Sequence, residues 1–278
     1  MNKSLNKPIK FSLVISVYLH DDINHFVDAM NSILRQTLMP NEIILAIDGP
    51  ISNEMESLIK KFKKKLFIKI IRSPINMGVG SIRDRAILSS KTEIIAVMDA
   101  DDISVDNRFE LQINYLATNK TDLLGGYIME FDKSINDCKR LRKVPLEHAD
   151  IIKKGKWIQP FNHVTIMFKK SAYLKSGGYG KDLVLEDSFL FHRMVISNAK
   201  FSNIPKNLVY VRANNDQMAR RLGIKYFKVE FSLLLSMFNS GYINLYNFIV
   251  SLSIRFILRC SPIFLLKFFN KFFLRTFL

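Results

Sequence analysis

Three carboxylates crowd into four positions where a short apolar run ends. Residues 94–98 have the length and β-branched content of a buried strand, and Asp99, Asp101 and Asp102 follow directly. Like charges at such a place repel one another and lose solvation, so a cation would stabilise them. Mg²⁺ and Mn²⁺ fit, because these hard ions bind carboxylate oxygens together with substrate phosphates. The segment indicates a metal-assisted site for a phosphate-bearing substrate; the alternative is a solvated acidic turn.

The segments around these acids alternate between strand and helix patterns. Strands are expected at residues 11–18, 42–47, 67–71 and 94–98. Helices are expected between them, at residues 25–38, 53–65 and 80–89. This order predicts a mostly parallel sheet with helices on both faces, which binds ligands at the carboxyl ends of its strands. Asp21, Asp22 and Asp48 also follow predicted strands, which favours a site over a chance acidic turn.

Composition narrows the function classes. The chain of 278 residues is 48% hydrophobic, which is typical of a globular protein rather than a disordered one. The net charge of +16 fits nucleic acid, an anionic membrane or small anionic substrates, but no nucleic-acid-binding motif is present. Cys138 and Cys260 lie far apart and suggest neither a disulfide framework nor a zinc site, as expected in a reducing compartment. No apolar run near the N-terminus has the form of a signal peptide.

Further motifs lie in a fixed order along residues 12–221. They are the first strand at 12–18, Asp48-Gly49, the Asn76…Arg83-Asp84 segment, Asp99-Ala100-Asp101, Gly177-Gly178-Tyr179 and Leu185-Glu186-Asp187. In this order they resemble family 2 of the inverting glycosyltransferases, which have the α/β GT-A fold. The stretch at 159–170, with His163, is similar to a subset that builds bacterial surface polysaccharides such as capsule, O-antigen and amylovoran. Departures are Asp84 in place of Asn and Gln159 in place of Asn.

The resemblance implies a UDP-sugar donor. Tyr18 ends the strand that begins the family's uridine pocket, and Asp48 would accept hydrogen bonds from uracil or ribose. The processive polymer synthases of the family carry a Gln-x-x-Arg-Trp motif, and the single tryptophan, Trp157, lies outside any such motif. A single-addition transferase is therefore expected rather than a polymer synthase.

The same resemblance implies how the donor diphosphate is held. Asp101, with Asp99 assisting and Asp102 as the motif's extension, would bind Mn²⁺ or Mg²⁺, which stabilises the leaving diphosphate as a Lewis acid. Arg83 would be a second clamp, because a guanidinium matches phosphate bidentately. The alternative for Arg83 is a surface arginine paired with Asp84.

Inversion requires a base on the face opposite the leaving group, where it deprotonates the acceptor hydroxyl. Asp187 is the predicted base. Glu186 beside it would orient the acceptor or raise the pKa of the base. The alternative for both acids is a capping or salt-bridged role at the start of a helix over residues 188–197.

Five further residues are candidates on the acceptor side. Gly177 and Gly178 would let the backbone approach the sugar closely, unless they form an ordinary turn. His163 is either a substrate-site residue or a structural histidine. Arg193 would face the diphosphate or pair with Glu186, and Arg221 would belong to a basic segment that closes over the diphosphate.

The last part of the chain, residues 216–278, is expected to be a helical extension of the GT-A domain at 1–215. Residues 241–278 contain no acid, and their basic residues recur four apart at Arg255 and Arg259 and again from Lys267 to Arg275. Phenylalanines lie between them, yet no apolar run reaches the ~18–20 residues that span a bilayer. This pattern favours an amphipathic segment on an anionic membrane surface. The alternative is a helix packed on the protein's own core.

These inferences together predict a metal-dependent, inverting glycosyltransferase. It would move one hexose, as glucose, galactose or an N-acetyl form, from a UDP-sugar to an undecaprenyl-diphosphate-linked glycan, with a β-1,3 link suggested by the resemblance. It would be peripheral, at the cytoplasmic face of the bacterial cell membrane, with no nucleic-acid partner. The alternatives are a non-catalytic membrane-associated scaffold and, less favoured, a nucleotidyltransferase, which would need a Gly-rich basic loop after the first strand.

Overall fold

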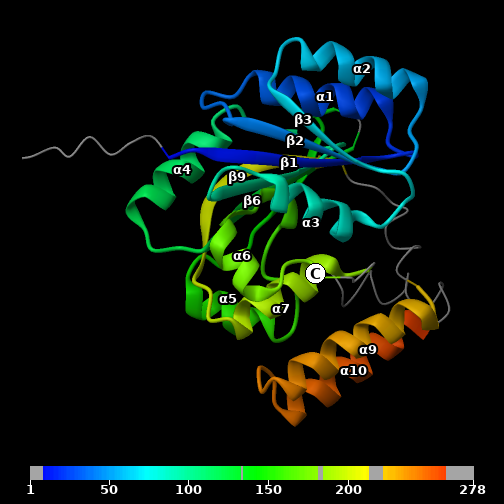
Figure 1. The fold of residues 1–278 in the computed structure, drawn as a ribbon. Coiled ribbons are helices and arrows are strands. Elements are labelled where there is room, and N and C mark those ends of the chain that lie inside the picture. The colour runs from blue at the N-terminus through cyan, green and yellow to red at the C-terminus, as the bar shows by residue number, and fades with distance from the viewer. Residues whose placement is uncertain (1–8, 133, 181–183, 213–221, 261–278) are drawn as a thin grey trace, which may run out of the picture. The chain divides into compact units, whose positions relative to one another are not determined.

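The computed structural model describes residues 9–132, 134–180, 184–212 and 222–260 (Figure 1). The chain divides into two compact units, residues 1–213 and 214–278. The strands of the first unit are β1 (Phe11–Tyr18), β2 (Glu42–Asp48), β3 (Ile68–Ser73), β4 (Ile94–Asp99), β5 (Ile103–Ser104), β6 (Leu123–Phe131), β7 (Cys138–Arg142), β8 (Met167–Lys169) and β9 (Phe201–Arg212). Its helices are α1 (Ile23–Leu34), α2 (Asn53–Lys63), α3 (Val79–Ser89), α4 (Arg108–Thr118), α5 (His148–Gly155), the 3₁₀ turn η1 (His163–Thr165), α6 (Lys170–Ser176) and α7 (Glu186–Ile196).

The strands form one nine-stranded sheet in the order β3-β2-β1-β4-β8-β6-β9-β5, with β7 beside β6. The predicted parallel arrangement is confirmed for β3, β2, β1 and β4. Strands β6 and β9 also pair in parallel. The prediction of a mostly parallel sheet is wrong for the other pairings: β8 runs antiparallel to both β4 and β6, β5 runs antiparallel to β9, and β7 runs antiparallel to β6. The sheet is therefore mixed. The direction of the three-residue β8 depends on the strands beside it, and local sequence does not indicate which strands those are.

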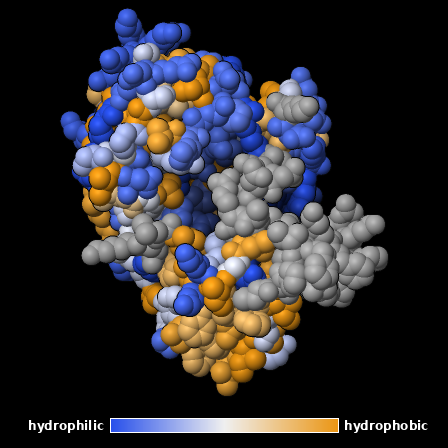
Figure 2. Space-filling view, turned by 90° about the vertical axis from the view of Figure 1, so that its right-hand side faces the viewer, coloured by the Kyte–Doolittle hydropathy of each residue, from blue (hydrophilic) through white to orange (hydrophobic). Residues whose placement is uncertain are grey.

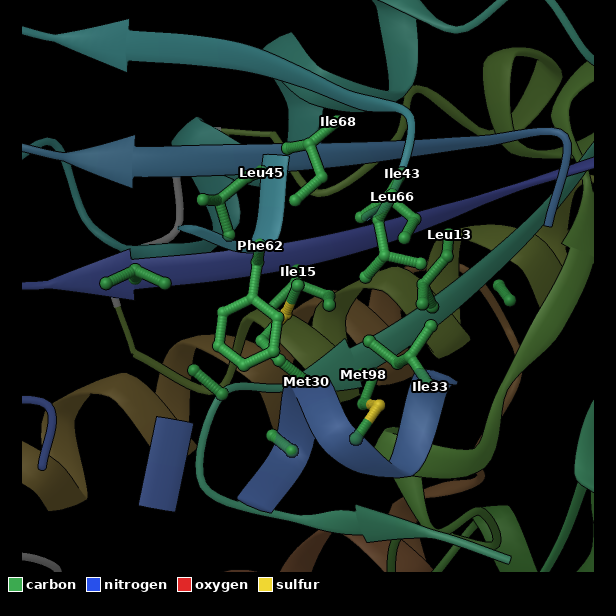
Figure 3. Close-up of a cluster of buried hydrophobic side chains, with 14 of the residues drawn as sticks. Leu13, Ile15, Met30, Ile33, Ile43, Leu45, Phe62, Leu66, Ile68 and Met98 are labelled. Atoms are coloured by element: carbon green, nitrogen blue, oxygen red, sulfur yellow. The ribbon is translucent and has the colours of Figure 1, made fainter. Parts of the chain in front are cut away.

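The core explains why the first four strands take this arrangement. Side chains alternate along a strand, so Leu13 and Ile15 of β1 point to the same face (Figure 3). On that face they lie with Met30 and Ile33 of α1 and with Phe62 of α2, all in one buried cluster (Figure 3). Helix α3 supplies its own buried apolar side chains and packs against β1 and β2. Helices α1 and α3 lie on opposite sides of these strands (Figure 1).

Strand register determines where the polar ends meet. Tyr18 of β1 pairs with Asp48 of β2, and Ser16 of β1 pairs with Asp99 of β4. The carboxyl ends of three neighbouring parallel strands therefore lie at one edge of the sheet, and each is followed by or contains an acid. This edge is where a parallel α/β sheet binds its ligands.

The second unit is a helical hairpin of α9 (Ile224–Asn239) and α10 (Leu245–Cys260) (Figure 1). The helices run antiparallel, because Phe227 packs near Phe256 while Phe238 packs near Phe248. Neither they nor any other described helix is both long and apolar enough to cross a bilayer. The predicted basic residues Lys267, Lys271 and Arg275 lie outside the described residues.

Candidate active site

The acids at the end of β4 form a compact group. Asp99, Asp101 and Asp102 each bring a carboxylate oxygen within 4.8 Å of the others. Asp102 is 2% exposed, and its pKa is raised well above the usual value, first by burial and then by the charges of Asp101 and Asp99. Three oxygen donors at one point suit a hard divalent cation. Such an ion would offset the repulsion, so these residues fit the predicted Mn²⁺ or Mg²⁺.

Arg83 of α3 lies against this group. It is 4% exposed, and its guanidinium donates to Asp99 Oδ1. Burial works against the charged guanidinium, but the Asp99 carboxylate raises its pKa overall. The alternative prediction, a surface arginine paired with Asp84, is wrong. Arg83 Nε is buried and has no hydrogen-bond partner within the described part of the chain, so this N–H is available to a bound anion.

Asp48 and Tyr18 occupy the neighbouring strand ends. Both carboxylate oxygens of Asp48 accept main-chain hydrogen bonds, from Met77 N at 2.7 Å and from Gly78 N at 2.9 Å. Asp48 therefore fixes the loop that leads into α3. Tyr18 is 37% exposed, and its N–H donates to Asp21 Oδ2 at 2.9 Å. The structure thus places both residues beside α3 and the acids of β4.

Asp21 lies close to the acid group. The sequence indicated it only as one of several acids that follow predicted strands. Its pKa is raised to about 7, first by burial and then by the charges of Asp101 and Asp99, so it lies within the field of the acid group.

Asp84, which stands where the family usually has Asn, has a structural role that the sequence did not predict. Its Oδ1 accepts hydrogen bonds from the Tyr173 hydroxyl and from Tyr179 N.

The Gly177-Gly178 turn ends α6 and passes close to α3. Gly178 has φ +65°, and a Cβ there would come 2.7 Å from Asp84 Oδ1 and 2.8 Å from the Tyr173 hydroxyl. The close approach that requires glycine is therefore to Asp84 and Tyr173. Gly177 has φ +85° at the end of α6, and a Cβ there would meet open space, so it is the left-handed residue that terminates the helix.

His163 and Tyr179 join the turn to the acid group. The Tyr179 hydroxyl lies 2.9 Å from His163 Nε2, and Tyr179 is fully buried. The pKa of His163 is lowered to about 4 by burial and by Arg83, against the opposing effects of Asp187 and Asp99. A neutral imidazole can accept the phenolic O–H at Nε2 and carry its proton at Nδ1. His163 is thus close to both the predicted base and the predicted metal ligands.

Glu186 and Asp187 are the first two residues of α7, which begins two residues earlier than the predicted helix. Burial and then the Asp187 charge raise the pKa of Glu186 to about 7, while Arg83 opposes them. Asp187 Oδ1 accepts the Ser188 N–H at 2.7 Å, which orients this carboxylate at the helix start. Leu185, with φ +61°, makes the sharp entry into the helix. Both acids therefore belong to the same electrostatic cluster as Arg83 and Asp99.

Arg193 of α7 donates to the carbonyl oxygens of Gly178 and Tyr179, at 3.3 and 2.9 Å, and so ties α7 to the glycine turn. Its two predicted roles, facing the diphosphate or pairing with Glu186, stay predictions. Arg221 lies outside the described residues.

Comparison with known proteins identifies the family of this chain. The family described as Glycosyl transferase family 2 matches residues 12–177. An uncharacterized glycosyltransferase of Haemophilus influenzae is 33% identical over 268 residues, which cover 96% of this chain and 100% of that protein. The Escherichia coli UDP-Gal:alpha-D-GlcNAc-diphosphoundecaprenol beta-1,3-galactosyltransferase is 30% identical, over 91% of this chain and 92% of that one. The amylovoran biosynthesis glycosyltransferase AmsE of Erwinia amylovora is 31% identical, over 84% and 88%.

Solved structures share the fold. TarS residues 1–349 of S. aureus, crystallised with UDP-GlcNAc, superimpose with a TM-score of 0.67 at 15% identity, over 90% of this chain and 73% of that one. This chain spans 44% of a longer TarS structure. The sheet is therefore that of a GT-A-like α/β fold. The family match extends over more than half of the chain and includes the acid group and Arg83, and the chain is a glycosyltransferase that belongs to family 2.

Proposed function

We propose that this glycosyltransferase moves one hexose, as glucose, galactose or an N-acetyl form, from a UDP-sugar to a lipid-linked glycan. The observation that carries the proposal is the buried Arg83, which pairs with Asp99 while the nearby Glu186 carboxylate acts on it. An anion clamp and a pair of carboxylates therefore share one cluster. A diphosphate leaving group and an acceptor hydroxyl need these two kinds of group side by side.

In this mechanism Asp187 accepts the proton of the acceptor hydroxyl while that oxygen attacks the anomeric carbon. The bond between this carbon and the UDP oxygen breaks, so configuration inverts and the diphosphate takes the electron pair. Arg83 turns its free N–H toward the charge that develops there. A divalent cation on Asp99, Asp101 and Asp102 would supply Lewis-acid stabilisation of the same charge. His163, held by Tyr179, is available to donate a hydrogen bond from Nδ1 to the bound sugars.

The relatives support the substrate classes. One is named for transfer of galactose from UDP-Gal to a GlcNAc-diphosphoundecaprenol in a β-1,3 link, and another for amylovoran synthesis. A β-1,3 transfer in bacterial surface polysaccharide synthesis is accordingly our proposal for this chain. A lipid-linked acceptor would bring the enzyme to the cytoplasmic face of the cell membrane as a peripheral protein.

A donor screen tests the proposal. Purified full-length protein with Mn²⁺ would be assayed with UDP- and GDP-sugars and a synthetic lipid-diphosphate GlcNAc or GalNAc. We expect turnover of one UDP-sugar, its loss in EDTA, and a fall in kcat of about 10²–10⁴-fold in Asp187→Asn, the usual contribution of a general base. Glu186→Gln is the matched control, expected to fall less because Glu186 orients the acceptor.

Two results would contradict this assignment. If Asp187→Asn kept full activity while Glu186→Gln lost it, Glu186 would be the base. If no donor turned over and UDP did not bind in a metal-dependent way, a non-catalytic scaffold would be favoured. Binding of UDP without turnover would exclude the tested acceptors and leave the enzyme class intact.

A further inference from the structure

Helix α10 reverses the usual distribution of side chains: its arginines face the partner helix α9, and apolar side chains are exposed. Arg259 donates to both oxygens of Glu230 on α9, at 2.9 and 3.0 Å, and its guanidinium lies over the Tyr226 ring. Arg255, four residues earlier, is also acted on by the Glu230 charge. The predicted basic stripe of Arg255 and Arg259 thus exists, but it faces the partner helix. The reason is Glu230, which is 5% exposed and draws these arginines inward.

The side of α10 that is turned away from this stripe is apolar and exposed. Four large side chains there are between 52 and 67% exposed: Leu245, Tyr246, Ile249 and Ile257. At 100° per residue they fall within an arc of about 120°, which defines the outer face of α10. Figure 2 shows apolar surface gathered at the lower end of the view, where Figure 1 has the hairpin. On α9, Phe231 and Leu235 are also partly exposed, at 39% each.

A water-soluble helix hides its apolar stripe and exposes its charges. In α10 the arginines are turned inward and the apolar side chains outward, an arrangement that favours an apolar environment around the outer face. The charge of the described hairpin indicates which one: Lys225 and Lys228 of α9 are exposed, and Glu230, the one acid of residues 222–260, is buried and paired with Arg259. A surface that combines bulky apolar groups with positive charge matches the interface of an anionic bilayer, in which the side chains enter between the lipids and the cations meet phosphates.

We propose that the α9–α10 hairpin lies in the plane of an anionic membrane with the outer face of α10 in the lipid interface. This inference rests on the proposed function insofar as a lipid-linked acceptor presents its sugar at a bilayer. The hairpin would then be the element that holds the enzyme at its acceptor. The ion pair between Glu230 and Arg259 lets α10 turn its apolar face outward, because it satisfies the charges between the helices.

Vesicle flotation of the full-length protein tests the proposal. The variant is Leu245→Glu with Ile249→Glu, which introduces charges only on exposed positions. The control is Phe67→Glu with Leu88→Glu, two exposed apolar residues of the first unit, 76 and 58% exposed. With phosphatidylglycerol–phosphatidylethanolamine vesicles, we expect the outer-face variant to bind at least tenfold more weakly than the unaltered protein, and the control to bind normally. Binding of the unaltered protein should weaken when phosphatidylcholine replaces the anionic lipid.

Activity separates this proposal from the proposed function. With a short-chain, water-soluble acceptor, kcat/KM of the outer-face variant should equal that of the unaltered protein, while transfer to a long-chain acceptor in vesicles should fall. If the unaltered protein binds vesicles but transfers no sugar, only the proposed function fails. Equal vesicle binding by the outer-face variant overturns the docking proposal. So does a dimer, seen by light scattering, that the variant dissociates while vesicles do not bind, because the face would then belong to a second copy of this chain.

Discussion

Arg83 is a buried cation of the candidate active site. It pairs directly with Asp99 among the acids of β4, and it also feels the charge of Glu186 at the start of α7. A buried arginine with an unsatisfied N–H is costly unless an anion completes its shell. We infer that the donor diphosphate completes it. Arg83 also lowers the pKa of His163 and opposes the rise in the pKa of Glu186. Binding of the diphosphate to Arg83 would therefore change both pKa values.

Glu186 gives a prediction for the pH dependence of stability in metal-free buffer. Its pKa is about 7 in the fold, raised from 4.5 by burial and by Asp187. Between these values the folded protein keeps a proton that the unfolded chain releases, so stability falls as pH rises through this window. The shift corresponds to about 3 kcal/mol at most. We expect Glu186→Gln to remove this loss, so that it is more stable than the unaltered protein at pH 8 and no more stable at pH 4.

Urea unfolding at several pH values, followed by circular dichroism, measures this difference. Glu54→Gln, on the exposed side of α2, is the matched control for the loss of a glutamate carboxylate at the surface. If the free energies of unfolding of the unaltered protein and Glu186→Gln change with pH in the same way across pH 4–8, the pKa of Glu186 is not raised in the fold and the prediction is wrong.

The sequence identified the candidate site residues whose signal is local. Asp99, Asp101 and Asp187 follow a strand or open a helix, and short motifs identify them. It missed contacts between distant positions. Asp84 meets Tyr173 and Tyr179, 89 and 95 positions away, and its acceptor role is visible only once α3 and the glycine turn lie together. Gly178 was predicted to approach a sugar, whereas its close neighbours are Asp84 and Tyr173. These neighbours, too, are distant in sequence or become close only in the fold.

Helix α4 carries a buried polar chain that joins four elements. Arg108 is fully buried and donates to Val97 O of β4 at 2.7 Å and to Ser104 Oγ of β5 at 3.1 Å. Its Nε donates to Gln112 Oε1 at 3.2 Å, and Gln112 donates in turn to Thr165 O of η1 at 2.8 Å. The turn that presents the three aspartates and the turn that presents His163 are therefore held by one network.

Replacement of Arg108 by Met should destabilise the protein by about 3 kcal/mol or more. It removes a buried cation near Asp102 and leaves main-chain and hydroxyl groups without their donor. The urea midpoint measures the loss. Arg35→Met is the matched control: Arg35 pairs with Asp106 on the surface, both side chains being over half exposed, and should cost less than about 1 kcal/mol. Equal losses in the two variants would mean that the network adds no stability.

The elements themselves were predictable only in the first half of the sheet. There, β1 to β4 are apolar runs separated by amphipathic helices, and the alternation itself specifies parallel pairing. From β6 onward the pattern fails. Strand β8 has three residues and follows a 3₁₀ turn, and β6 pairs with β9 across about 80 positions with irregular register. Which strand pairs with which in this half depends on the edge of the sheet that is available. That edge exists only in the assembled fold, so local sequence cannot indicate it.

Each of the two units has its own source of stability. The first unit is stabilised by the apolar cluster between the sheet and its helices. The hairpin has fewer buried apolar residues of its own and instead holds its helices together through the bidentate pair of Glu230 and Arg259, with Gly223 N donating to Arg259 O at 2.9 Å. A buried pair of this kind is strongly destabilising to break, by about 3–5 kcal/mol, because one charge stays behind.

Glu230→Gln should therefore loosen the hairpin and spare the sheet. In hydrogen–deuterium exchange we expect faster exchange across residues 224–260 and unchanged exchange in β1 to β4, since their core does not depend on this pair. Glu230→Gln with Arg259→Met, which removes both charges of the pair, should recover part of the protection, because Arg259 is then no longer left without its counter-charge and Arg255 loses a like-charged neighbour. Faster exchange throughout the sheet in Glu230→Gln would show instead that the two units unfold as one. No recovery in the double variant would mean that the geometry of the pair, and not its charge balance, holds α9 to α10.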